Sequence, residues 1–297
     1  MTAKIELDAH SLLESLQDAT KQQLAPAQKD WLTSSLAHVQ TKLKCAADSP
    51  KKVSCMLIPI LDEAGHQLGP APLQWQTHIK LASESSVLPW QPQHWTLSDA
   101  GRVLLQSACV EPNLFAKESD CLENRPENRC QNTLEQLYKR GDESERGALL
   151  KALVMLDPKG DSLEFAVNAC RVNSLTLFIS IALFNPYPAL FFDDAAFNQL
   201  VLKSLFQGVD IGYIWGLEER LNDDLSVMAQ RYVEERQDAG RSVPDSIWRV
   251  IDVNSLTERC KALLTELLAQ PNHPAHKVVL SAVSRSGISI AAFEAPH

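Results

Sequence analysis

The chain has 297 residues, and its 45% hydrophobic and 22% charged residues are typical of a folded protein, which excludes a wholly disordered chain. Its formal net charge is −9, and its densest basic clusters are pairs such as Lys51–Lys52 and Lys139–Arg140. Because affinity for nucleic acids and for anionic membrane surfaces comes largely from clustered Lys and Arg, we expect no partner of either kind.

Two helices are predicted at the start of the chain, over residues 9–24 and 27–46. Leu12 and Leu16 recur at helical spacing in the first helix, and the second shows the same pattern. Pro26 lies just inside the start of the second helix, where its missing N–H costs no hydrogen bond. We expect the two helices to pack antiparallel.

Residues 49–92 contain six prolines, which oppose long helices because each removes a backbone donor and restricts the residue before it. We interpret this stretch as a long irregular connection with short extended pieces at 53–61 and 73–81. One small hairpin is expected within it. Three tryptophans lie among or just after these prolines, and packing of an ordered loop explains them better than a ligand cage does.

A further helix is predicted from Thr96 to the residues before Pro112. Residues 116–130 are rich in Glu, Asn, Asp and Lys, which indicates a solvated surface loop at a domain boundary. Strand is expected only within 49–92 and 278–293. The predicted division is an N-terminal helical subdomain (1–115), the loop (116–130), a second helical domain (131–270) and a C-terminal extension (271–297).

The second half of the chain is predicted to consist almost entirely of helices. They are expected over residues 131–140, 143–156, 161–171, 174–184, 193–207, 222–238, 245–252 and 255–269. Residues 200–205 echo residues 148–153, which favours stacked helix pairs. The predicted fold class is therefore all-α, with helix pairs stacked as in a short α-solenoid of the HEAT type.

The N-terminus and the cysteines indicate a cytoplasmic protein. Glu6 and Asp8 interrupt the apolar stretch that a signal peptide needs. The seven cysteines are dispersed, and no two have the C-x-x-C spacing of a zinc or redox site, which fits a reducing compartment. The longest apolar run, Leu175–Phe184, is shorter than the roughly 20 residues that span a bilayer.

The most distinctive stretch runs from Arg171 to Trp248. It contains Arg-x-Asn at 171–173, Asn-Pro-Tyr-Pro at 185–188, Phe-Asn-Gln at 197–199 followed by Lys203, Gly-Leu at 216–217, and Glu-Arg at 235–236 before Gly-Arg at 240–241. At these residues the chain resembles the EboA family, named for a gene cluster of bacteria and algal plastids associated with trafficking of secondary metabolites. The resemblance covers roughly residues 142–252. It implies a helical protein with a supporting role in handling a metabolite and with no established biochemical activity.

Seven polar residues of this stretch are candidate ligand-binding residues, because they interrupt apolar helices and turns. They are Arg171, Asn173, Asn185, Tyr187, Asn198, Lys203 and Arg220. Buried polar groups must be paired internally or face a cavity. One interpretation is a pocket where these side chains converge on an anionic or hydroxylated ligand. The other is structural: Arg171 or Lys203 pairs with one of the acids Glu164, Glu218 and Glu219. Asn173 and Asn185 then cap helix ends and hold the Asn-Pro-Tyr-Pro turn.

No catalytic residue, metal or cofactor is assigned from the sequence. All eight histidines lie outside the EboA-like stretch. His273 and His276 have helical spacing for a metal, yet Pro271 and Pro274 favour a solvated loop there. The acid pairs at 193–194 and 223–224 begin predicted helices, so capping explains them.

The favoured function is a non-enzymatic helical-repeat protein that binds a small metabolite or a partner protein in a secondary-metabolite pathway. One alternative is an enzyme of unrecognised type that uses Lys203 or an Arg–carboxylate site, since a lysine buried among apolar residues can act as a base or a Schiff-base nucleophile. Another alternative is a scaffold whose polar residues only hold helices in register.

Overall fold

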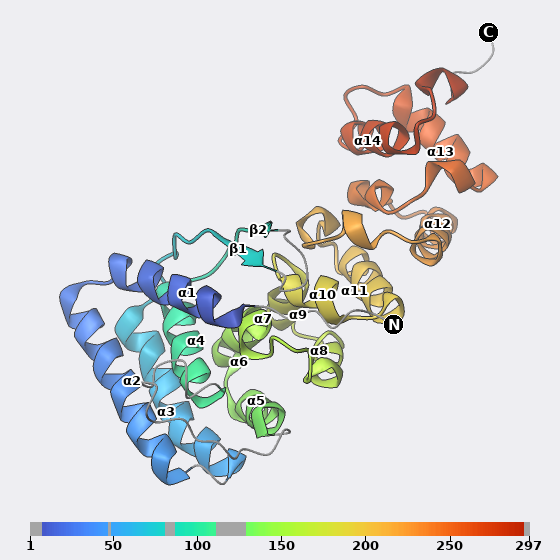
Figure 1. Ribbon diagram of the computed structural model, residues 1–297. Coiled ribbons are helices and arrows are strands. Elements are labelled where there is room, and N and C mark those ends of the chain that lie inside the picture. The colour runs from blue at the N-terminus through green and yellow to red at the C-terminus, as the bar shows by residue number, and fades with distance from the viewer. Residues whose placement is uncertain (1–7, 47–48, 81–86, 111–128, 294–297) are drawn as a thin grey trace. The chain divides into compact units, whose positions relative to one another are not determined.

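The computed structural model describes residues 8–46, 49–80, 87–110 and 129–293 (Figure 1). The chain divides into two compact units, Met1–Phe191 (unit 1) and Phe192–His297 (unit 2). The all-α prediction is confirmed, because regular structure in the described ranges is helical apart from one pair of short strands. The solenoid-like stacking of helix pairs stays a prediction. No helix in these ranges is long and apolar enough to cross a membrane.

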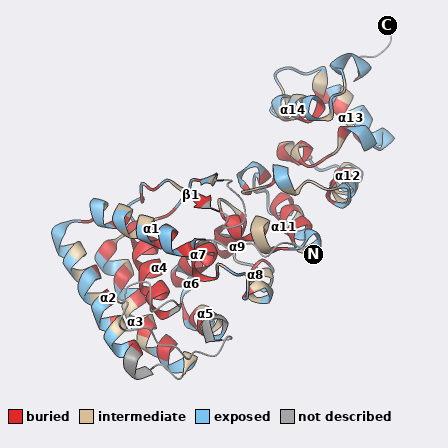
Figure 2. Ribbon diagram, in the orientation of Figure 1, coloured by how far each residue is buried: buried red, intermediate tan, exposed pale blue. Residues whose placement is uncertain are grey.

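Unit 1 is built from helices and one hairpin. In chain order these are α1 (Ala9–Gln23), α2 (Pro26–Ala46), α3 (Pro50–Leu68), β1 (Thr77–Lys80), β2 (Val87–Trp90), α4 (Leu97–Val110), α5 (Arg129–Arg140), α6 (Glu143–Lys151), α7 (Leu153–Leu156), α8 (Leu163–Ala169), α9 (Leu175–Ala182) and α10 (Pro186–Phe191). Helix α4 is the core of the unit: residues 97–109 are buried on every side, with α1, α2, α3 and α6 packed around them (Figure 2). A helix that is apolar on most faces is expected at such a position.

Helices α3 and α4 approach each other closely through two glycines. The buried Arg102 of α4 reaches across to α3, where its Nε donates to the Leu61 carbonyl at 3.1 Å. A Cβ atom at Gly65 would collide with that guanidinium, and a Cβ atom at Gly101 would collide with the side chain of Leu68. A larger residue at either position would therefore require the facing side chain, Arg102 or Leu68, to shift.

The prediction of an irregular connection over 49–92 is wrong for its first half, which is helix α3, and so is the extended piece expected at 53–61. Ser49 caps this helix, with its Oγ accepting from the Lys52 N–H at 3.4 Å, and Pro50 occupies the first turn, where it needs no hydrogen bond. Pro59 lies inside the helix. Val53, Leu57, Leu61, Ala64 and Leu68 are buried along one face, and this packing outweighs the cost of one interior proline.

The small hairpin predicted in the second half of this stretch is confirmed. Strands β1 and β2 pair antiparallel, with Thr77 opposite Trp90 and Lys80 opposite Val87. The rings of Trp75, Trp90 and Trp95 pack edge to face, with centroids 5.3–6.4 Å apart. The hairpin is thus anchored by its aromatic base, since two short strands alone are only marginally stable.

The chain divides between Phe191 and Phe192, whereas the sequence placed a boundary within residues 116–130. Residues 111–128 of that loop lie outside the described ranges. The helices before and after the loop share one core, because α5 packs against α3 and α6 packs against α4. The predicted subdomain 1–115 and the first part of the predicted domain 131–270 therefore belong to a single unit.

Unit 2 contains four α-helices and several 3-10 turns in its described residues. In chain order they are α11 (Asp194–Phe206), η3 (Ile211–Tyr213), η4 (Glu218–Arg220), α12 (Asp223–Asp238), η5 (Asp245–Arg249), η6 (Val253–Ser255), α13 (Glu258–Leu268), α14 (His276–Ser286) and η7 (Ile290–Phe293). Residues 276–286 are helical where a strand was expected within 278–293. Val279, Ala282 and Val283 recur at helical spacing and are buried, so this helix packs against η5 and α13.

Candidate functional site

The seven candidate ligand-binding residues are divided between the two units. Arg171, Asn173, Asn185 and Tyr187 lie in unit 1, and Asn198, Lys203 and Arg220 lie in unit 2. Each side chain is therefore described within its own unit. Their surroundings separate them into residues that hold the backbone and residues that stand at the surface.

Asn185 holds the turn between α9 and α10. Its Nδ2 donates to the carbonyls of Leu150 at 2.9 Å and Ser180 at 3.0 Å, and its Oδ1 accepts from the Tyr187 N–H at 3.0 Å. The residue is only 2% exposed. Three of its hydrogen-bonding positions are thus occupied by backbone groups, as the structural interpretation expects.

Tyr187 is fully buried, and its phenol donates to Oδ2 of Asp157 at 2.5 Å. Asp157 also accepts from the backbone N–H groups of Asp161 at 3.0 Å and Ser162 at 2.8 Å. Burial raises the pKa of the Asp157 carboxyl, and these hydrogen bonds oppose that rise. The pair closes the loop between α7 and α8, and the sequence analysis did not single out Asp157.

Arg171 and Asn173 follow α8 and are exposed. The Arg171 guanidinium donates to Oδ1 of Asn168, three residues earlier, at 3.1 Å. Neither residue lies in a cavity that the structure describes. They differ from Asn185 and Tyr187, although all four belong to the same distinctive stretch of sequence.

In unit 2, Asn198 and Asn222 form a reciprocal amide pair. Each Nδ2 donates to the other's Oδ1 at 3.0 Å, and Asn198 is 2% exposed. Oδ1 of Asn222 also accepts from the Leu225 N–H at 2.9 Å and so caps α12. One pair of side chains therefore joins the middle of α11 to the start of α12.

Arg220 secures the segment that leads into α12. Its Nη2 donates to the Phe192 carbonyl at 2.8 Å and to Oδ1 of Asp194 at 3.0 Å. The guanidinium lies over the ring of Phe197, with its carbon 4.7 Å from the ring centroid. The carbonyl of Arg220 accepts from Nδ2 of Asn222 at 3.1 Å, so the arginine and the amide pair act on the same backbone.

Lys203 lies in the second half of α11 and is half-buried. The residue is therefore not fully enclosed by apolar surfaces. Helix α11 buries Phe197, Leu200, Val201 and Leu205, while the Lys203 side chain retains contact with solvent.

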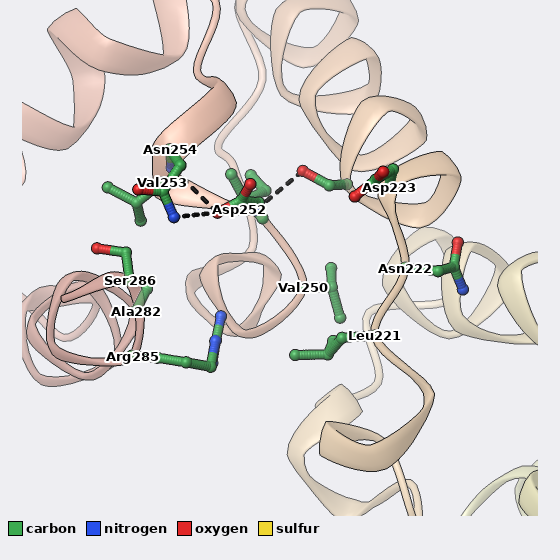
Figure 3. A pocket seen from close by; sticks show the side chains of 12 residues that line it. Leu221, Asn222, Asp223, Val250, Asp252, Val253, Asn254, Ala282, Arg285 and Ser286 are labelled. Carbon is green, nitrogen blue, oxygen red and sulfur yellow. Dashed lines mark hydrogen bonds between the residues drawn. The ribbon is translucent and has the colours of Figure 1, made fainter. Parts of the chain in front are cut away.

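Beside Asn222 lies a pocket of about 260 Å³, here called the α12 pocket (Figure 3). Its walls come from the start of α12, from residues 250–254 and from the end of α14. Leu221, Val250 and Ala282 contribute apolar surface. Its polar lining residues include Asn222, Asp223, Ser226, Asp252, Asn254 and Arg285.

Several polar groups of the α12 pocket are already paired with each other. Oγ of Ser226 accepts from the Asp252 N–H at 2.9 Å, and Oδ1 of Asp252 accepts from the Asn254 backbone N–H at 3.0 Å. Nη1 of Arg285 donates to Glu218 at 3.2 Å, so its charge is compensated outside the pocket. Within the described ranges Asp223 makes no hydrogen bond or ion pair, and its carboxylate is available to a ligand.

Most of this pocket lay outside the sequence-based candidates. Only Asn198 and Arg220 were foreseen near it, and they position its wall through Asn222 rather than line it. Asp252 carries a signal that could have been used, because Asp side chains in turns commonly accept from the backbone N–H two residues on. In the described ranges no three His, Cys, Asp or Glu side chains lie together as a metal site.

Fold and site together define a helical protein with a small pocket in its C-terminal unit and no metal cluster among the described residues. The chain belongs to the EboA family: the family model, described as "Metabolite traffic protein EboA", matches residues 12–252. The match begins far earlier than the resemblance at 142–252 indicated, so it includes most of unit 1. Comparison with curated proteins and with solved structures gives no match.

Proposed function

We propose that this protein binds a small hydroxylated metabolite in the α12 pocket and serves metabolite traffic as a binding protein. The observation that carries the proposal is the Asn198–Asn222 pair, which with Arg220 fixes the backbone at one wall of that pocket. A preorganised wall lowers the cost of ordering side chains when a ligand binds. The family description supports a role in metabolite traffic.

The size and charge of the α12 pocket favour a compact ligand with hydroxyl or amine donors. Its volume of about 260 Å³ lies just below the usual range of roughly 300–1,000 Å³ for ligand pockets. Asp223 and Asp252 place two carboxylates in the lining, while the Arg285 charge is paired with Glu218. Carboxylates accept hydrogen bonds from hydroxyls and repel anions, so the proposal keeps the hydroxylated ligand of the sequence analysis and drops the anionic one.

In this proposal the seven sequence candidates have different tasks. Asn198 and Arg220 position the pocket wall, and Asn185 and Tyr187 hold the turn between α9 and α10 in unit 1. Arg171, Asn173 and Lys203 are surface or half-buried groups outside the pocket lining.

Equilibrium dialysis against a defined mixture of small polyols, hydroxy amino acids and amino alcohols, read by mass spectrometry, tests the proposal. The matched variants are Asp223→Asn and Asp224→Asn. Both aspartates are exposed in the first turn of α12, so both substitutions weaken the helix terminus equally, but only Asp223 lines the pocket. We expect a compound enriched by the wild type to be lost by Asp223→Asn and retained by Asp224→Asn.

Equal retention by the two variants would show that the compound binds elsewhere. No enrichment of any hydroxylated compound by the wild type would overturn the proposed ligand class. It would favour the alternative of the sequence analysis, a partner protein of the pathway.

A further inference from the structure

A second, larger concavity lies in unit 1 where the two extended segments before and after the hairpin separate. Pro72 is bridged to Thr96, and the strands pair again from Thr77 and Trp90. Between these two pairings one segment has four residues, 73–76, and the other has five, 91–95. They enclose a groove of about 790 Å³, here called the glutamine groove.

The wall of the groove contains an indole N–H that bonds to no other group of the described residues. Of the three packed indoles, Trp75 donates its Nε1–H to Ser15 at 3.0 Å and Trp90 donates to the Phe184 carbonyl at 2.8 Å. Trp95 is 3% exposed and lines the groove, yet its indole N–H has no partner in the described part of the chain. This N–H is not fully enclosed by the protein, so it is available to an acceptor in the groove.

The rim of the groove carries four exposed glutamines, Gln74, Gln76, Gln91 and Gln93. Their side-chain amides make no hydrogen bond within the described residues. Each primary amide both donates and accepts, which matches hydroxyl groups and does not select for charge. No Asp, Glu, Lys or Arg is among the described residues that line the groove.

The backbone of the groove is held rigid from outside. His94 has a positive φ of 61°, a strained conformation for a residue with a Cβ atom. Nζ of Lys151 donates to the His94 carbonyl and to Oδ2 of Asp99, both at 2.8 Å. Gln23 holds the other segment, because its amide exchanges two hydrogen bonds of 2.8 Å with the backbone of Gln74. The charges of Lys151 and Asp99 compensate each other. Lys151 therefore holds the His94 backbone without adding a net charge beside the groove.

We propose that the glutamine groove binds a neutral, polyhydroxylated ligand, of the chemical class of an uncharged sugar or glycosyl group. The rim glutamines exchange hydrogen bonds with its hydroxyls, and the Trp95 N–H donates to one of its oxygens. The volume of about 790 Å³ accommodates a ligand of two or more rings. This site is independent of the α12 pocket, which lies in the other unit and is lined by carboxylates.

Saturation-transfer NMR with a panel of neutral disaccharides (trehalose, sucrose, maltose and cellobiose) tests this site on the full chain. In parallel, the indole N–H resonance of Trp95, assigned by its loss in Trp95→Phe, is followed in ¹⁵N spectra. We expect saturation transfer to at least one disaccharide, a shift of the Trp95 resonance, and little dependence on salt because no formal charges take part.

Three variants locate the binding. Gln76→Ala/Gln93→Ala removes two exposed rim amides, and it should weaken binding at least ten-fold. Gln22→Ala removes an equally exposed amide of unit 1 on α1 and should leave binding unchanged. Asp223→Asn should also leave it unchanged, which separates this site from the proposed function.

The proposal is overturned if no disaccharide of the panel shows saturation transfer at millimolar concentration. Binding that survives the double substitution overturns it as well. So does a Trp95 resonance that shifts only with an extended proline-rich peptide, since that result would make the groove a peptide site.

Discussion

The glutamine groove of unit 1 and the α12 pocket of unit 2 differ in how their polar groups are used. In the groove, the rim amides and the Trp95 N–H have no partners among the described residues, and the rigidity comes from Lys151 and Gln23 outside it. In the pocket, Ser226, Asp252 and Asn254 bond to each other, and Asp223 is the available charge. A surface with unpaired neutral amides and a small charged pocket would select for different ligands, so we propose separate binding chemistry for the two units.

The distinctive residues of the sequence follow the same division. Asn185 and Tyr187 are buried in contacts with their own unit, and Asn198 and Arg220 secure a wall beside the α12 pocket. Polar residues in an apolar stretch therefore indicate structural networks first. The ligand groups that we propose lie on less conspicuous residues such as Asp223 and Gln93, which line the two pockets.

The largest loss of stability is expected for Asn222→Ala, which tests the network beside the α12 pocket. The substitution removes the cap of α12 and leaves the buried Asn198 amide without its partner. Losing a cap costs about 1 kcal/mol, and leaving a buried amide without a partner costs about 1–3 kcal/mol. We therefore expect the free energy of unfolding to fall by roughly 2–4 kcal/mol. Hydrogen–deuterium exchange should show faster opening of α11 and α12.

The control for that experiment is Asn173→Ala, which removes an exposed amide of unit 1. It should change the free energy of unfolding by no more than about 0.5 kcal/mol. Equal losses in the two variants would mean that the Asn198–Asn222 pair contributes no more to stability than an exposed amide does.

Tyr187→Phe is the corresponding change in unit 1 and is expected to have a smaller effect. It removes one donor from Asp157, which keeps its two backbone N–H groups. A hydrogen bond to a charged group contributes about 1.5–3 kcal/mol, and the retained donors place the expected loss near the lower end of that range. Urea unfolding measures it.

Tyr232→Phe is the matched control for Tyr187→Phe. The Tyr232 hydroxyl is half-buried and donates to the Leu205 carbonyl at a long 3.4 Å. Its removal should cost less than about 0.5 kcal/mol. A larger loss for Tyr232→Phe than for Tyr187→Phe would contradict the expected contribution of the Tyr187–Asp157 hydrogen bond to the stability of unit 1.

The sequence was sufficient to predict helices with a strong helical spacing of apolar residues. It was not sufficient for helices that contain prolines and are stabilised by packing against the rest of the unit. Helix α3 was hidden by its prolines, although Val53, Leu57 and Leu61 already carried the helical spacing. The first residue of α10 is itself a proline, within an Asn-Pro-Tyr-Pro stretch that was taken for a turn. In both cases a rule about single prolines was given more weight than the buried face of the segment.

The sites were less predictable than the fold for a different physical reason. The amide partner of Asn198 lies 24 residues away, and the walls of the α12 pocket come from three separate segments. Such pairings depend on how helices pack and leave no mark in local spacing. The glutamine groove is more local, and its four glutamines flank tryptophans and a proline in the printed sequence. That pattern could have been recognised.

A pH-dependent effect of moderate size is expected at Asp157. Because burial raises its pKa in the folded protein, the folded state binds this proton more tightly than the unfolded state does. Its contribution to stability is therefore fully present below the ordinary carboxyl pKa and is lost as pH rises through the raised pKa. We expect Asp157→Asn to reduce the gain in melting temperature that the wild type shows on mild acidification.

Glu145 limits how far the Asp157→Asn substitution can reduce this gain in melting temperature on acidification. The pKa of its carboxyl is also raised, mainly by burial, and it remains in the variant. A residual gain on acidification is therefore expected in Asp157→Asn. An unchanged slope would show that Asp157 keeps an ordinary pKa in the folded chain.

The smallest expected effect is that of Lys203→Met. A fully buried ammonium would give one of two large signals: a loss of about 3–5 kcal/mol if a carboxylate were stranded, or a gain if desolvation were relieved. Lys203 is half-buried, and neither large signal is expected of a partly exposed side chain. We expect a change within about 1 kcal/mol in either direction, since partly exposed ion pairs contribute little. Thermal melts of the two proteins, with Lys159→Met as an exposed control, measure this change in stability.

A loss above about 3 kcal/mol would mean that Lys203 belongs to a buried ion pair. The proposed site of unit 2 would then have to be moved to α11. A borohydride-trapped adduct at Lys203 with a carbonyl compound would instead support the enzymatic alternative, because a hydrated surface lysine has no special reactivity toward carbonyls.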